Sequence, residues 1–337
     1  MKLTFPADGP LVRGVPPPRS LIPYSAEQDA LPLLDAIVGA ARAVRAPFFF
    51  PGHKMGIGAP SALRRRLLGG KVLRHDLPEL PELDNLFAPE GPILEAERLA
   101  ALAFGAARTW LLVNGSTGGV LAAILACVQL WSQRQLSRDA SDRNASDLAP
   151  VVLLPRNAHK SAIHALVLSG AQPAWLAPAY DAESGISLGI PPTEIEQALA
   201  RHGDRIAAVL LVSPTYQGVL CDIAAAAQLT RDAAVPLVVD EAHGGHLEFL
   251  PPSAPLPASC PATARPRSAL SQGADFAVQS THKVCSPPFR ASWHVLLHVT
   301  RVTHVAHALH ALHRFSDRSH RVQCSTRPRR RSRRGPP

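Results

Sequence analysis

Two polar clusters stand where buried strands are predicted to end. The apolar run 274–279 leads into a cluster that ends at Lys283, and the run 236–239 leads into Asp240. A lysine at the end of a buried strand suits an amine that is partly withdrawn from water and can form a Schiff base with an aldehyde. A carboxylate at a second strand end can keep a ring nitrogen protonated, so that the ring accepts electrons. This pair of residue types indicates pyridoxal-phosphate chemistry.

A small-residue turn supplies the kind of group that binds a phosphate. The sequence Gly-Ser-Thr-Gly-Gly at 115–119 joins a predicted strand to a predicted helix. Small residues such as Gly118 let backbone N–H groups approach a phosphate, and the hydroxyls of Ser116 and Thr117 add donors. The N-terminus of the following helix favours the negative charge. The alternative interpretation of these residues is an ordinary tight turn.

Two histidines follow predicted strand ends. His159 is either a helix cap or surface residue, or a ring that stacks flat on a cofactor. His243 stands where it could lie near a Schiff base. Asp240 also has an alternative role, because a buried acid can instead hydrogen-bond a neighbouring loop. The four signals taken together, in the order turn, His, Asp and Lys, favour one cofactor site over four unrelated residues.

The elements that must position these groups alternate along the chain. Predicted strands alternate with predicted helices, which indicates an α/β fold. The expected architecture is three-layer αβα, with a mostly parallel sheet covered by helices on both faces. In such sheets functional groups gather at the carboxyl ends of the strands, and every cluster above lies there. A capping box at Thr193 and Glu196 is predicted to begin one of the helices. Strands are predicted at 109–113, 151–154, 174–176, 207–212, 236–239 and 274–279. Helices are predicted at 26–45, 93–106, 118–131 and 193–202, and two further helices are predicted to end at 169 and to begin at 223.

Composition sets broad limits. The chain has 337 residues, of which 46% are hydrophobic, so it can bury a sizeable core. The longest apolar stretch, 118–131, fits a buried helix and not a membrane span. The five cysteines are scattered without metal-ligand spacing, which predicts a cytoplasmic protein and no metal site. Residues 1–24 lack a secretory signal, but they are rich in proline and poor in acids, which leaves a plastid as the alternative.

The net charge is a property of one end of the chain. The formal charge is +9, yet residues 284–337 hold 11 arginines, no lysine and one acid, Asp317. The remainder is therefore close to neutral, and no nucleic-acid partner is predicted for it.

Six segments in sequence order resemble signatures of the Orn/Lys/Arg decarboxylase family, which are fold-type-I, aspartate-aminotransferase-like pyridoxal-phosphate enzymes. The resemblance runs from about residue 25 to Val284. The segments are Pro-Gly-His-Lys at 51–54, Leu-Asp-Asn-Leu at 83–86 with Pro-Glu-Gly-Pro-Ile at 89–93, Asn-Gly-Ser-Thr-Gly-Gly at 114–119, Arg-Asn-Ala-His-Lys-Ser at 156–161, Asp-Glu-Ala-His-Gly at 240–244 and Gln-Ser-Thr-His-Lys at 279–283.

The resemblance implies a role for each site residue. Lys283, His243 and Asp240 would be catalytic, with Lys283 holding pyridoxal 5′-phosphate as a Schiff base and Asp240 pairing with the ring nitrogen. His159 would stack on the ring and Thr215 would lie near its edge. The phosphate would be held by Ser116, Thr117, Gly118, Ser280 and His282.

The activity implied is decarboxylation of lysine, ornithine or arginine to a polyamine precursor, in a homodimer or larger assembly. The alternatives are another fold-type-I reaction, such as transamination or a lyase reaction, and an inactive relative. Asp84 and Glu90 are candidates for binding the distal cation of the substrate, or they belong to a solvated acidic loop. His53 and Lys54 either line a pocket or are turn residues.

The expected organisation has three parts. Residues 1–24 form an irregular arm, residues 25–284 form the cofactor-binding major domain, and residues 285–337 are an aberrant basic tail. The tail shows no strand period, and only 299–313 is predicted as a weak helix. We interpret it as a frameshifted or mis-spliced segment that replaces the family's small C-terminal domain. The alternative is a genuine basic extension that binds an acidic partner or nucleic acid, in a strongly salt-dependent way.

Overall fold

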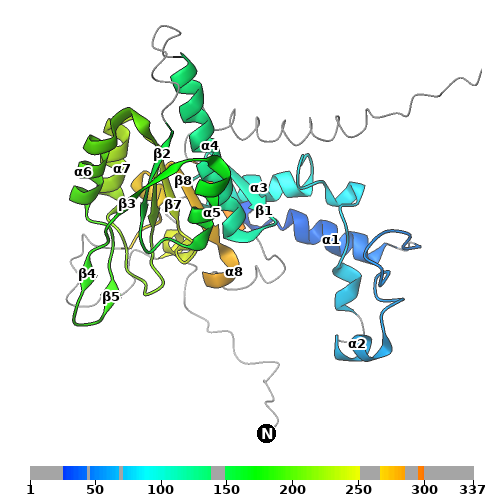
Figure 1. The fold of residues 1–337 in the computed structure, drawn as a ribbon. Helices are drawn as coiled ribbons and strands as arrows, with labels where there is room; N and C mark the ends of the chain where they lie inside the picture. The colour runs from blue at the N-terminus through cyan, green and yellow to red at the C-terminus, as the bar shows by residue number, and fades with distance from the viewer. Residues whose placement is uncertain are drawn as a thin grey trace, which may run out of the picture.

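A seven-stranded sheet in the order β1-β9-β8-β7-β6-β2-β3 forms the centre of the protein (Figure 1). The computed structural model describes residues 26–43, 46–67, 71–137, 149–250, 266–284 and 295–299. A separate hairpin is formed by β4 (Tyr180–Asp181) and β5 (Ile186–Ser187). The strands of the main sheet are β1 (Arg108–Leu112), β2 (Val151–Pro155), β3 (Gln172–Leu176), β6 (Ile206–Val212), β7 (Leu237–Asp240), β8 (Phe276–Ser280) and β9 (Val295–Val299).

Helices cover both faces of this sheet. Alternate residues of each central strand face opposite layers, so that Leu210 packs with α4 and α5 while Leu211 packs with α3, α6 and α7. The predicted three-layer αβα fold is therefore confirmed. The helices are α1 (Pro32–Arg42), α2 (Ser61–Arg66), α3 (Pro92–Ala103), α4 (Gly115–Ser137), α5 (Lys160–Ser169), α6 (Pro192–His202), α7 (Ile223–Asp232) and α8 (Thr281–Val284), with short 3-10 turns η1 (Ala26–Asp29), η3 (Val72–His75), η4 (Pro81–Leu83), η5 (Gly203–Arg205), η6 (Gly245–Phe249) and η8 (Leu270–Gln272).

The strand β9 corrects one expectation from the sequence. Strands β3, β2, β6, β7 and β8 of the main sheet run parallel, whereas β9 lies antiparallel between β1 and β8. The prediction that no strand follows residue 284 was wrong for Val295–Val299. Its apolar run, Val-Leu-Leu at 295–297, is short and lies in a segment whose arginine content dominates the composition, so it gives a weak strand signal. The arm 1–24 and residues 300–337 lie outside the described residues.

The start of α6 differs from the prediction. The helix begins at Pro192, and the residue before it, Pro191, makes no side-chain capping bond. Thr193 therefore lies inside the first turn, and the predicted capping box with Glu196 is wrong. A proline at the first helical position starts the helix without a cap, because its φ is already helical and it has no N–H to satisfy.

The long helix α4 packs closely on the sheet beside the predicted phosphate turn. By length and composition Gly115–Leu136 could cross a membrane. In the structure, however, Ala123, Ile124 and Cys127 are fully buried against the sheet and α5, which makes α4 a core helix. At Gly119 a Cβ atom would stand 2.6 Å from Val278 Cγ1 and 2.9 Å from Leu112 Cδ1. This glycine therefore allows the close approach of α4 to β8 and β1.

Replacing Gly119 with alanine should destabilise the fold by about 1–3 kcal/mol, because the added methyl overpacks a contact between a helix and the sheet. Thermal unfolding followed by circular dichroism measures the change. Gly39→Ala is the matched control, because a Cβ at Gly39 of α1 meets no atom within 4 Å. That variant should be neutral or more stable by up to about 1 kcal/mol, since alanine has the higher helix propensity. Equal unfolding temperatures for the two variants would contradict the packing argument.

Candidate active site

Residues at or after the ends of five strands, β1, β2, β6, β7 and β8, line one pocket at the carboxyl edge of the sheet. The structure brings together five of the residues singled out in the sequence, which come from the N-terminus of α4 and from the ends of β2, β7 and β8. Tyr216, Val212 and Ala242 complete the lining, with Ser116, His159, Asp240, His243 and Lys283 as the five predicted residues.

Asp240 is the carboxylate of this pocket. It is the last residue of β7 and only 7% of it is exposed to solvent. Its Oδ1 accepts a hydrogen bond of 3.2 Å from the backbone N–H of Ala242. Burial raises the pKa of Asp240, although the Ala242 N–H and the nearby His159 and Lys283 act in the opposite direction. A buried acid that lines a pocket is stabilised as an anion when a cationic N–H is placed against it.

Lys283 stands at the mouth of the pocket, in the one-turn helix α8 that follows β8. Its Nζ lies 3.4 Å from Nε2 of His243. The side chain is exposed, so the expectation of an amine partly withdrawn from water is not met in this structure. The reason is local, because β8 ends at Ser280 and Lys283 lies beyond the sheet edge. The amine is therefore accessible to an incoming aldehyde.

His243 and Tyr216 form an aromatic pair on the wall of the pocket. Their rings meet edge to face, with centroids 5.0 Å apart and an angle of 63° between the planes. Burial lowers the pKa of His243, and the charge of Lys283 lowers it further. Near pH 7 His243 is therefore mainly neutral, and its Nε2 can exchange a proton with the neighbouring amine.

Tyr216 was missed in the sequence, where Thr215 was chosen from the same segment. Thr215 is buried, and its Oγ1 accepts the backbone N–H of Val219 at 3.2 Å, which closes the turn after β6. Thr215 does not line the pocket, whereas Tyr216 does. The available signal was a bulky aromatic residue in the polar segment that follows β6.

His159 fits both interpretations drawn from the sequence. It is the N-cap of α5, and its Nδ1 accepts the backbone N–H of Ser161 at 3.2 Å. It also lines the pocket. A ring nitrogen that accepts a backbone N–H carries no proton, so the proton of the neutral ring is on Nε2. The cap therefore fixes both the tautomer and the position of the ring.

Of the predicted phosphate-binding residues, Ser116 lines the described pocket and the others do not. Ser116 lines the pocket from the first turn of α4, while Thr117 and Gly118 belong to the same turn but not to the lining. Ser280 is fully buried at the end of β8, and its Oγ has no hydrogen-bond partner among the described residues. His282 has an exposed side chain in α8. A helix N-terminus and an unpartnered buried hydroxyl are groups that suit an anion.

The Pro-Gly-His-Lys segment is folded on itself, as its turn interpretation expected. Lys54 Nζ donates a hydrogen bond of 2.6 Å to the carbonyl of Phe49. His53 Nε2 lies 3.0 Å from Oδ2 of Asp76. Neither side chain lines the described pocket.

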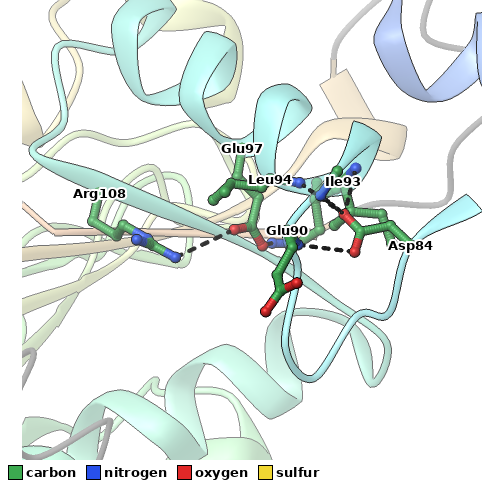
Figure 2. Close-up of polar contacts among 8 residues, drawn as sticks. Asp84, Glu90, Ile93, Leu94, Glu97 and Arg108 are labelled. Atoms are coloured by element: carbon green, nitrogen blue, oxygen red, sulfur yellow. Dashed lines mark hydrogen bonds and ion pairs between the residues drawn. The ribbon is translucent and has the colours of Figure 1, made fainter.

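Asp84 is an anchor for the start of α3 and does not line the pocket (Figure 2). Its carboxylate accepts backbone N–H groups of five residues at distances from 2.7 to 3.4 Å, namely Asn85, Glu90, Gly91, Ile93 and Leu94. Burial alone would raise the pKa of Asp84, but these N–H groups outweigh it and lower the pKa. The side chain of Glu90 is exposed. The alternative interpretation of the acidic loop therefore fits these two residues, with Asp84 as its structural anchor.

Replacing Asp84 with asparagine should destabilise the protein by about 1–2 kcal/mol, the scale of a lost helix cap. Asparagine has nearly the size and shape of aspartate, so the loss reports on the charge and on the second carboxylate oxygen. Because the folded-state pKa is lowered, the contribution of Asp84 is present above its ordinary pKa and is lost as pH falls through the folded-state value. Thermal unfolding from pH 7 down to pH 3 tests this, with Glu90→Ala as a control that should change little. A larger loss in Glu90→Ala would contradict the assignment.

Comparisons with known proteins decide the family. A sequence profile described as "Orn/Lys/Arg decarboxylase, major domain" matches residues 31–309. The chain belongs to the Orn/Lys/Arg decarboxylase family. The match extends past residue 284, which agrees with the presence of β9 beyond that point.

Relatives and solved structures within this decarboxylase family are moderately similar. An arginine decarboxylase of Halalkalibacterium halodurans is 35% identical over 257 residues, covering 76% of this chain and 46% of the relative. An arginine decarboxylase of Bacillus subtilis has the same identity and coverage. The chain thus spans about half the length of these curated relatives. The lysine decarboxylase LdcF of Francisella novicida has a TM-score of 0.60 at 23% identity, over 85% of this chain and 38% of that one, which shows the fold.

Proposed function

We propose that the protein of which this chain carries the major domain decarboxylates a basic amino acid with pyridoxal 5′-phosphate. The observation that carries the proposal is the pocket in which Asp240, His243, Lys283 and His159 meet. Membership of the decarboxylase family supports the reaction. Relatives named arginine decarboxylase and lysine decarboxylase support a substrate among arginine, lysine and ornithine, with a polyamine precursor as product.

The residues present fit this cofactor. Asp240 is a buried acid in need of a cationic N–H, and Ser280 has a buried hydroxyl in need of a partner. Lys283 would hold the aldehyde, Asp240 the ring nitrogen and His159 the face of the ring. The turn at the start of α4, with Ser116, Thr117 and Gly118, would hold the phosphate together with Ser280 and His282.

The chain's own groups would control protons and orientation around the reacting atoms. When bound, the cofactor supplies a ring that accepts the electron pair released with carbon dioxide. Asp240 would keep the ring nitrogen protonated. His243 Nε2, 3.4 Å from Lys283 Nζ, would hold a proton for return to the substrate carbon, and Tyr216 would keep the imidazole in place.

A second copy of the chain is the partner that we propose. Large apolar side chains are exposed in the N-terminal segments 46–67 and 71–92, part of which, with α2, extends away from the sheet at the right of Figure 1. Phe48 is 94% exposed and Phe50 is 80% exposed, and Ile57 and Phe87 are exposed as well. Exposed aromatic residues in one segment are typical of a protein interface, which supports a homodimer or larger assembly. The free, buried Cys127 and Cys221 support a cytoplasmic location, with a plastid as the alternative.

An absorbance spectrum with added pyridoxal 5′-phosphate tests the proposal directly. We expect an absorbance band at about 420 nm that borohydride removes. The reduced cofactor should then map to Lys283. Carbon dioxide release from lysine, ornithine and arginine then identifies the substrate. Formation of a keto acid without carbon dioxide would indicate a transaminase instead. A folded protein that leaves Lys283 unlabelled would refute the proposed cofactor site.

A further inference from the structure

Glu241 is a buried carboxyl that bridges the ends of two strands. It directly follows Asp240, and only 1% of it is exposed. Its Oε2 accepts a hydrogen bond of 2.7 Å from Nε2 of Gln279, the residue before Ser280 in β8. Its Oε1 accepts the backbone N–H of Ala269, also at 2.7 Å, just before η8. The family resemblance and the cofactor roles proposed above leave this residue without a function.

The backbone and side chain of Glu241 also hold the loop that follows β7. Its N–H donates to the carbonyl of Val278 and its carbonyl accepts the N–H of Gly244, both at 2.9 Å. A Cβ on Gly244 would stand 2.6 Å from Glu241 Cγ and 2.7 Å from Pro214 Cδ. The Glu241 side chain therefore fills the space beneath this loop, next to the segment that follows β6.

The segments that meet at Glu241 are those that carry the pocket. The segment after β6 carries Tyr216, the loop after β7 carries His243, and the end of β8 leads to Lys283. We propose that Glu241 is the positioning residue of the site, which ties the ends of β7 and β8 together and so fixes Asp240, His243 and Lys283 relative to one another. The inference rests on the proposed function, because the geometry that it preserves is that of the cofactor site.

The protonation of Glu241 suggests how to test this role. Burial raises the pKa of Glu241 to about 8, although the bonds from Gln279 and Ala269 oppose the rise. Near pH 7 the side chain is therefore largely a neutral acid, which glutamine resembles in size and charge. Glutamine can still accept the Ala269 N–H, and Gln279 can turn its amide to accept in return. Alanine can make neither bond.

The experiment compares Glu241→Ala and Glu241→Gln with the matched pair Glu97→Ala and Glu97→Gln. Glu97 is also buried, at 2% exposure, and accepts the backbone N–H of Leu111 at 3.1 Å, away from the pocket. The dissociation constant of pyridoxal 5′-phosphate and the pH dependence of its absorbance are measured by titration. Hydrogen exchange of the cofactor-free protein is followed at residues 240–244 and 276–283.

Glu241→Ala should weaken cofactor binding by about 10-fold or more, which is the scale of loss when a residue that orients the binding groups is removed. It should also shift the pH dependence of the cofactor absorbance. It should also speed exchange at 240–244 and 276–283, whereas Glu241→Gln should stay within about 3-fold of the wild type. Glu97→Ala should lower the unfolding temperature and leave the binding constant and the pH dependence unchanged. If Glu241→Ala does not fold, Gln279→Met removes the β8 half of the bridge and should weaken binding in the same way.

Two results would overturn the inference. One is wild-type binding, pH dependence and exchange in folded Glu241→Ala, and the other is an equal loss of binding in Glu97→Ala. Failure of the proposed function is distinguishable, because the wild type itself would then leave Lys283 unlabelled. The exchange measurement needs no cofactor, so in that case it still shows whether Glu241 holds the ends of β7 and β8 together.

Discussion

Replacing Lys283 with alanine should abolish covalent attachment of pyridoxal 5′-phosphate and lower decarboxylation by about 1,000-fold or more. The pocket that the structure describes contains this lysine as its amine, and His243 beside it cannot form a Schiff base. The fold should survive, because the Lys283 side chain is exposed and truncation of a surface residue changes the free energy of unfolding by about 0.5 kcal/mol or less. Borohydride labelling and carbon dioxide release measure the two losses.

The same variant has a second readout that needs no cofactor. Burial is the main reason that the pKa of His243 is lowered, and the charge of Lys283 lowers it further. Removing that charge should therefore raise the His243 pKa toward its usual value, which a proton NMR titration would follow. Lys71→Ala is the control, because Lys71 is exposed on the N-terminal segment and does not line the pocket. A Lys283→Ala variant with more than a tenth of wild-type activity would place the reactive amine elsewhere.

Replacing Asp240 with asparagine should change activity and stability in opposite directions. Decarboxylation should fall by about 100-fold or more, because an amide cannot hold the positive charge on a ring nitrogen as a carboxylate does. The cofactor-free variant should be at least as stable as the wild type near pH 7. The carboxyl is buried and accepts a hydrogen bond from the backbone N–H of Ala242, and removing its charge relieves the cost of burial.

The raised pKa of Asp240 fixes how its contribution to the free energy of unfolding changes with pH. Burial raises the folded-state pKa of Asp240 above its ordinary 3.8, so the folded protein binds more protons than the unfolded chain between the two values. Stability conferred by the protonated form is therefore lost as pH rises through that window. Unfolding of the cofactor-free protein between pH 4 and pH 8 should show a flatter curve for Asp240→Asn. Asp222→Asn, at the exposed N-cap of α7, is the control that should leave activity unchanged. A large loss of stability in Asp240→Asn would argue against its assigned role.

The sequence was sufficient to predict six of the seven strands of the main sheet, because these strands are mostly apolar and end in chemically distinct residues. Strands buried on both faces, such as Val151–Pro155 and Ile206–Val212, read as continuous apolar runs between polar turns. The three-layer fold was predicted because such strands alternate with helices along the chain. β9 was not, because its short apolar run lies in a segment whose arginine content dominates the composition.

The pocket could be predicted only as a set of strand ends. Residue types identified Asp240 and Lys283, since an acid and an amine are costly at the ends of buried strands. Side-chain direction cannot be read in the same way, and Tyr216 lines the pocket while the adjacent Thr215 closes a turn. The roles of Asp84 and Glu241 could not be predicted, because they depend on contacts made in the folded chain. Asp84 accepts five backbone N–H groups, and Glu241 links the ends of two strands.

The place of β9 in the sheet has a consequence for the order in which the protein folds. Strands β2, β3, β6, β7 and β8 can pair with one another as they leave the ribosome, but β1 joins the described sheet through β9, with Arg108 opposite Val299. Such a long-range pairing closes late and slowly. The helix α4, which carries Ser116, packs on α5 and on Leu210 of β6, so it can dock before β9 is made. We therefore expect β1 to join the sheet only after residues 295–299 have been synthesised, as the last of the described strands to pair.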